Sequence, residues 1–96
     1  MITKELVVLE LIVRNHPGTM SHITGMFSRR GFNIEGIICA PKADEEISRM
    51  LLVVDDGPRR MQLIAQIEKL YDVMQVIVRT ENGRKLCNAL REQMER

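Results

Sequence analysis

The residues best suited to chemistry lie in one short segment, Asn15-His16-Pro17-Gly18-Thr19-Met20. It joins an apolar stretch to a helical pattern, so the first backbone N–H groups of that helix are left without partners. Such a helix N-terminus binds carboxylates, and Gly18 would let a ligand approach the main chain. The Asn15 amide suits an ammonium group, and Met20 and Ile23 would form an apolar wall. The segment predicts a site for a small anion or zwitterion; the alternative interpretation is an ordinary strand-to-helix turn.

Groups for catalysis or metal binding are sparse in this chain. His16 and His22 lack a second His, Cys or carboxylate at a spacing typical of metal sites or general bases, so we expect solvated histidines. The acidic turn at 44–46 lacks the alternating oxygen ligands of a calcium loop. Ser21 and Ser28 have no base beside them. The sequence therefore predicts a binding protein that is not an enzyme, with no metal site and no catalytic residue.

Length and charge narrow the class further. The 96 residues make one domain, and a net charge of +1 indicates neither a nucleic-acid-binding nor a membrane-binding surface. No apolar run reaches the roughly 20 residues of a membrane helix. Two isolated thiols, Cys39 and Cys87, and a start that passes directly into a strand without a signal peptide favour the cytoplasm. RNA binding on an open sheet would need aromatic side chains on the central strands, and none is present there.

Hydrophobic periodicity predicts four strands and three helices. Gly31 is placed to end the first helix, and Pro58 to begin the second, whose buried stripe would include Leu70 and Tyr71. The order predicts an α+β, ferredoxin-like βαββαβ fold, with two helices on one face of a four-stranded antiparallel sheet and a C-terminal helical extension. The expected elements are a strand over 5–14, a helix over 19–30, strands over 32–40 and 48–54, a helix from 58, a strand over 73–79 and a helix over 83–96.

The sheet face opposite the two helices is expected to be unusually apolar. Glu10 and Arg49 are its few charges. A face of this kind favours association with a second copy or another protein; the alternative is that the C-terminal helix folds back over part of it. The expected apolar members are Val8, Ile12, Ile37, Cys39, Leu51, Val53 and Ile77.

Three stretches together resemble a known family: LIVRNHPGTMSHITGMFSRRGFNIEGI at 11–37, SRMLLVVDD at 48–56 and QLIAQIEKLYDVMQV at 62–76. They are similar to the ACT domain of the small regulatory subunit of acetohydroxyacid synthase (acetolactate synthase), over most of residues 5–78. The resemblance implies a non-catalytic partner of a large catalytic subunit, which would hold thiamine diphosphate, Mg and FAD. It also implies a homodimer with an eight-stranded sheet, activation of the large subunit, and feedback inhibition by a branched-chain amino acid, usually valine, bound between two ACT domains.

The resemblance also assigns effector-binding residues. Asn15, Gly18 and Met20 fall on the effector loop, and Asn33 and Ile34 would come from the neighbouring protomer. The predicted domains are an ACT domain over 1–80 and an extension over 81–96, as in the short type of small subunit. A free-standing ACT amino-acid sensor acting on another enzyme or a transporter is the alternative. The full predicted site is Asn15, His16, Pro17, Gly18, Thr19, Met20, Ile23, Asn33 and Ile34.

Overall fold

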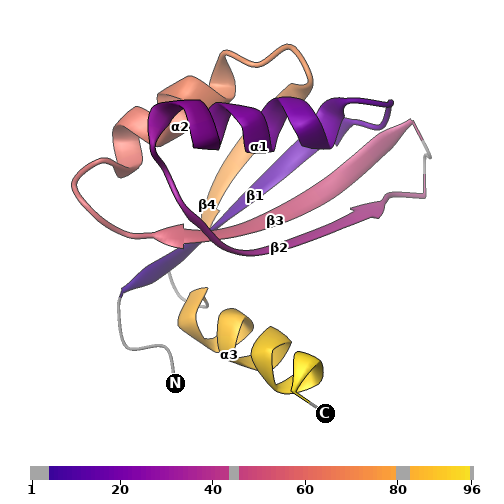
Figure 1. The fold of residues 1–96 in the computed structure, drawn as a ribbon. Coiled ribbons are helices and arrows are strands. Elements are labelled where there is room, and N and C mark those ends of the chain that lie inside the picture. The colour runs from indigo at the N-terminus through magenta and orange to yellow at the C-terminus, as the bar shows by residue number, and fades with distance from the viewer. Residues whose placement is uncertain (1–4, 44–45, 80–82, 96) are drawn as a thin grey trace.

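The computed structural model describes residues 5–43, 46–79 and 83–95, and their architecture confirms the predicted fold class. All strand pairs are antiparallel, and the sheet order is β2-β3-β1-β4. Figure 1 shows α1 and α2 on one face of this sheet and α3 on the other. The elements are β1 (Leu6–Arg14), α1 (Thr19–Arg30), β2 (Ile34–Pro41), β3 (Ile47–Asp55), α2 (Arg60–Glu68), β4 (Val73–Arg79) and α3 (Gly83–Met94).

The main core lies between the sheet and the two helices above it. Alternate residues of the central strand β1 point to opposite faces, and those that face α1 and α2 are fully buried. They pack against the apolar stripes of both helices, so β1 and the start of α1 are held in a rigid frame. This cluster contains Val7, Leu9, Leu11, Val13, Ile23, Met26, Phe27, Met50, Leu52, Val54, Leu63 and Ile67.

A second, smaller core lies on the opposite face, under α3. Leu6, Val8, Val53 and Cys87 are buried together there, with Leu51 and Leu86 packed against them. The C-terminal helix therefore covers part of the face for which we expected a second copy, as in the alternative interpretation. In this structure α3 therefore covers strand residues that the sequence interpretation left open to a second copy.

A β-bulge in β2 changes which residues share that face. Ile34 pairs with Val54, but Gly36 pairs with Val53, so the register slips by one residue at Glu35. A slip of one residue moves every following side chain to the other face. Ile37 and Cys39 consequently stand opposite Leu52 and Met50 on the helix-covered side. Their predicted place on the open face was wrong; Gly36, Ile38 and Ala40 lie there instead.

The helix ends agree only partly with the predicted ones. Gly31 caps α1 in the left-handed conformation, with φ of 72°. The second helix begins at Arg60, two residues after the predicted start at Pro58, and ends at Glu68. Tyr71 therefore lies beyond the helix and is 78% exposed, so its predicted burial was wrong. None of the helices in the described part of the chain is long and apolar enough to cross a bilayer.

Candidate ligand-binding loop at the start of α1

The connection from β1 to α1 presents an uncapped helix N-terminus. Gly18 precedes the helix with φ of 95°, a conformation that favours glycine, and no side chain caps the first turn. The Thr19 N–H donates to the His16 carbonyl at 3.3 Å. Within the described residues, the N–H groups of Gly18 and Met20 find no acceptor. The first turn also has no acidic residue, so its partial positive charge is available to an anion.

Two of the predicted site residues support this loop from behind. The Thr19 hydroxyl donates to the Arg14 carbonyl at 2.7 Å, and Thr19 is buried. Ile23 is fully buried in the main core. By contrast, Met20 is 42% exposed on the surface of α1 beside the loop. The exposed Asn15 donates its N–H to the Glu46 carbonyl at 2.8 Å, which joins the loop to the start of β3.

A carboxylate that the sequence interpretation missed lies directly under the loop. Asp72 follows α2 just before β4, and its side chain is only 5% exposed. The Nε2 atom of His16 lies 2.5 Å from its Oδ1, and the Nδ1 atom of His22 lies 2.6 Å from its Oδ2. The Asp72 carbonyl also accepts the Arg14 N–H at 2.8 Å. The two histidines, whose side chains are 39% and 61% exposed, are therefore partly solvated as expected, but both also contact a buried carboxylate that the sequence interpretation did not include.

These contacts shift the protonation equilibria of both partners. The pKa of His16 is raised by its hydrogen bond to the Pro17 carbonyl, at 2.8 Å from Nδ1, and by its bond to Asp72. The pKa of Asp72 is lowered by its hydrogen bonds to His22 and His16, against the opposing effect of burial. Protonated His16 and ionised Asp72 thus stabilise each other beneath the loop.

His22 also limits how a ligand can approach Gly18. A Cβ atom built on Gly18 would lie 3.6 Å from Cε1 and 3.7 Å from Nε2 of His22. The imidazole ring therefore covers that side of the glycine. A ligand would have to reach the exposed N–H groups from the other side of the loop.

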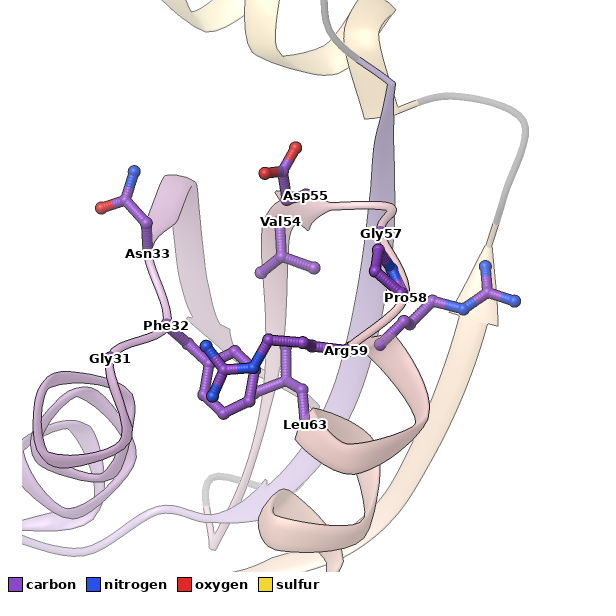
Figure 2. Close-up of a pocket in the computed structure, with 10 residues that line it drawn as sticks. Gly31, Phe32, Asn33, Val54, Asp55, Gly57, Pro58, Arg59 and Leu63 are labelled. Atoms are coloured by element: carbon purple, nitrogen blue, oxygen red, sulfur yellow. The ribbon is translucent and has the colours of Figure 1, made fainter.

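The remaining predicted residues lie at the far end of α1. Asn33 and Ile34 follow that helix, whose 12 residues span about 18 Å. Asn33 donates from Nδ2 to Glu35 Oε2 at 2.7 Å and lies at the rim of a hollow of about 240 Å³. Figure 2 shows Arg59 across the Phe32 ring in this hollow, with the guanidinium carbon 4.1 Å from the ring centre. A single chain therefore does not bring Asn33 to the loop.

One edge of the sheet lies beside the loop. β2 is an edge strand, so one row of its backbone groups has no neighbouring strand among the described residues. Ile37 is 37% exposed on the helix-covered side of β2, the same side as Met20 on α1. An unpaired strand edge with exposed apolar side chains is a surface on which another strand can add.

Comparison with known proteins identifies close relatives. Residues 9–75 match the family model described as the AHAS small subunit-like ACT domain. The acetolactate synthase isozyme 1 small subunit of Escherichia coli K12 is 53% identical over 74 residues, which cover 77% of each chain. A probable acetolactate synthase small subunit of Archaeoglobus fulgidus is 35% identical over 82 residues, and the match covers 52% of its length.

Solved structures agree with these matches. The crystal structure of an acetolactate synthase small subunit from Thermotoga maritima has a TM-score of 0.70 and 30% identity, over 76% of this chain and 46% of that one. The regulatory subunit of aspartate kinase from Thermus flavus has a TM-score of 0.68 at 18% identity, which is a likeness of fold alone. The present chain therefore spans about half the length of several relatives, and the matched region includes both the loop and Asp72.

Proposed function

The chain belongs to the family of AHAS small subunit-like ACT domains, and from this premise we propose that it is a cytoplasmic, non-catalytic regulatory subunit of an acetolactate synthase. Its effector is a branched-chain amino acid, with L-valine the first candidate. The observation that supports the effector site most strongly is the uncapped start of α1, where the N–H groups of Gly18 and Met20 have no acceptor within the described residues.

The effector would bind by complementary charges at this loop. Its carboxylate would accept hydrogen bonds from Gly18 and Met20 N–H groups, at the positive end of the helix dipole. Its ammonium group would meet the side-chain oxygen of Asn15, and exposed Met20 would contact its aliphatic side chain. Thr19 and Ile23, which are buried, would stabilise the conformation of the loop through the hydrogen bond to the Arg14 carbonyl and through packing in the main core.

A second copy of the chain would complete the site. Asn33 and Ile34 lie at the far end of α1 in their own chain, so they would reach the loop only from a partner. The unpaired edge of β2 and the exposed Ile37 support a dimer through this edge. Two antiparallel β2 strands would then join the sheets into one of eight strands.

Regulation would follow from the difference between dimer arrangements. An effector that binds at the seam favours the arrangement in which both halves of its site meet. The large subunit, which would hold thiamine diphosphate, Mg and FAD, would detect that arrangement. This chain would raise the activity of the large subunit and make it sensitive to the effector.

Reconstitution with the catalytic subunit of the same organism tests the proposal. We expect acetolactate formation to rise when the chain is added, and to fall again with L-valine. Asn15→Ala should keep the activation and lose the inhibition, because the substitution removes the side-chain oxygen that would meet the effector ammonium and leaves the backbone hydrogen bond to Glu46 in place. Absence of activation would contradict the role as a small subunit, and if L-valine still bound, the chain would be a free-standing amino-acid sensor.

A further inference from the structure

The contacts beneath the loop point to a residue that neither the family match nor the sequence motifs single out. We propose that Asp72 is the positioning residue of the effector loop, holding it through His16 and His22, and that it keeps His16 as an imidazolium beneath this loop, so that effector binding depends on pH. The inference rests on the proposed effector role of this loop.

The first step is the geometry of the Asp72 carboxylate. Each carboxylate oxygen contacts one histidine ring: Oδ1 lies 2.5 Å from Nε2 of His16, and Oδ2 lies 2.6 Å from Nδ1 of His22. The two histidines flank Gly18 in the chain, one before it in the loop and one in the first turns of α1. A single buried carboxylate therefore holds both sides of the segment whose N–H groups would bind the effector.

The second step concerns the protons on His16. Its Nε2 faces a carboxylate oxygen and its Nδ1 faces the Pro17 carbonyl oxygen at 2.8 Å. Both of these oxygens are acceptors, so both ring nitrogens must donate. Only the imidazolium form of histidine has two N–H groups. With Asp72 ionised, the geometry thus favours a positive charge on His16 in this conformation of the loop.

The third step is the charge around His16. Arg14 on β1 lies nearby and opposes protonation, whereas Asp72 favours it. Arg14 is itself held to the turn after α2, with Nε 3.3 Å from the Tyr71 carbonyl and its guanidinium carbon 4.7 Å from the centre of the Tyr71 ring. His22 on α1 shares the carboxylate. A protonated His16 balances the charge of Asp72, so the carboxylate does not oppose the partial positive charge at the start of α1.

The direction of the pH effect follows from these contacts. Loss of the His16 proton removes one of its two hydrogen bonds and the positive charge beside the loop. Affinity for an amino-acid carboxylate should therefore be highest below the raised pKa of His16 and fall as the pH rises through it. Because charges near a surface interact by about 1 kcal/mol or more, we expect a fall of about threefold to tenfold between pH 6 and pH 8.5.

Calorimetric titration of L-valine into the full chain at these two pH values tests the inference. His16→Gln can still donate one hydrogen bond to Asp72 but does not titrate, so comparison with the wild type removes the titration of valine itself. Wild-type affinity should fall with pH more steeply than that of His16→Gln. Asp72→Asn should bind more weakly at pH 6, and its pH dependence should move to lower pH together with the titration of His16. The matched control, Asp56→Asn, removes an ion pair with Arg60 elsewhere and should behave as wild type.

The NMR signals of ¹⁵N-labelled imidazole provide a second readout that does not need the effector. His16 should show two protonated ring nitrogens at pH 6 in the wild type, and its titration should move to lower pH in Asp72→Asn. Equal pH profiles of L-valine affinity for the wild type and His16→Gln would overturn the inference and leave the proposed function standing. The same holds if the pKa of His16 is unchanged in Asp72→Asn. Failure of L-valine, L-isoleucine and L-leucine to bind at either pH would overturn the effector role and this inference with it.

Discussion

The carboxylate of Asp72 and the imidazole of His16 lie 2.5 Å apart, although 56 positions separate them in the chain. This contact joins the turn between α2 and β4 to the loop between β1 and α1. Asp72 is buried and His16 is partly exposed, so the carboxylate supplies a fixed point for a surface loop. A binding loop is placed more precisely when residues outside it hold it by hydrogen bonds.

The stability of the protein should depend on this pair in a defined pH window. The pKa of His16 is higher in the folded protein than its ordinary value of 6.5. The pair therefore contributes its full stability below pH 6.5 and loses it as the pH rises through the pKa of His16 in the folded protein. The pKa of Asp72 is lower in the folded protein than its ordinary value of 3.8. The pair therefore contributes its full stability above pH 3.8 and loses it as the pH falls through the pKa of Asp72 in the folded protein. The destabilisation caused by Asp72→Asn, measured by urea unfolding, should therefore be largest between these two values. A loss that stays constant from pH 4 to pH 9 would contradict the ion pair.

Gly18→Ala should destabilise the fold because of the backbone conformation alone. The φ of Gly18 is 95°, and an added Cβ would be in ordinary contact with His22 at 3.6 Å. The left-handed conformation costs a residue other than glycine about 1–2 kcal/mol, which urea unfolding would detect. Gly57→Ala is the matched control, since that glycine has no positive φ and nothing within 4 Å of the added Cβ. Equal effects of the two substitutions would contradict this account.

Glu10 is the buried charge of the face opposite α1 and α2. Its carboxylate contacts Arg49 Nε at 2.9 Å and Arg79 Nε at 2.6 Å, and both arginines are about half exposed. Glu10→Gln should cost about 1–3 kcal/mol of unfolding free energy at pH 7. The hydrogen bonds to Arg49 and Arg79 lower the pKa of Glu10 from its ordinary value of 4.5. The destabilisation by Glu10→Gln should therefore persist down to pH 4.5 and disappear as the pH falls through the pKa of Glu10 in the folded protein.

Glu95→Gln is the control for Glu10, because Glu95 forms an exposed pair with Arg91 at 3.2 Å within α3. An exposed pair of this kind contributes about 0.3–0.5 kcal/mol. If the two substitutions cost the same at pH 7, the burial of Glu10 would have no energetic consequence.

Thiol labelling can test the position of α3 on the sheet. In a Cys39→Ser background the remaining Cys87, which lies on α3 and is buried against the sheet, should react slowly. Gly36→Val would add a branched side chain at a position where a Cβ atom alone would lie 3.4 Å from both Leu90 and Val53. Overpacking of this kind costs about 1–3 kcal/mol, so Cys87 should react about tenfold faster.

Ala40→Val is the matched control for this labelling experiment. Ala40 points to the same face from the same strand and is exposed, so the added methyl groups should leave the rate for Cys87 unchanged. Rapid labelling of Cys87 without any second substitution would show that α3 is not seated on the sheet.

The sequence predicted those features that depend on local patterns. Alternating apolar residues in β1 and the spacing of Ile23 and Phe27 in α1 reflect burial against one layer, so the order of elements followed from them. The glycine caps of α1 also have local causes, since only glycine readily adopts their backbone angles. The position of the loop at the start of a helix could therefore be predicted.

Features that depend on distant parts of the chain could not be predicted in the same way. The bulge at Glu35 reverses the faces of Ile37 and Cys39; the adjacent Gly36 is a residue type common at bulges, but its presence alone does not predict a change of register. The carboxylate between His16 and His22 comes from Asp72, whose place beside the loop results from the packing of α2 and β4. A search for carboxylates near the histidines in the sequence misses such a contact.

The central claim is that the loop of one chain and Asn33 of another form one effector site, and mixing two inactive variants tests it most directly. Calorimetry with L-valine should detect no binding to dimers of Asn15→Ala alone or of Asn33→Ala alone. After the two variants are unfolded together and refolded as an equal mixture, about one quarter of the wild-type sites should return, because each mixed dimer has one intact site. Wild-type binding by Asn33→Ala alone, or no recovery in a mixture shown to contain mixed dimers, would contradict the claim.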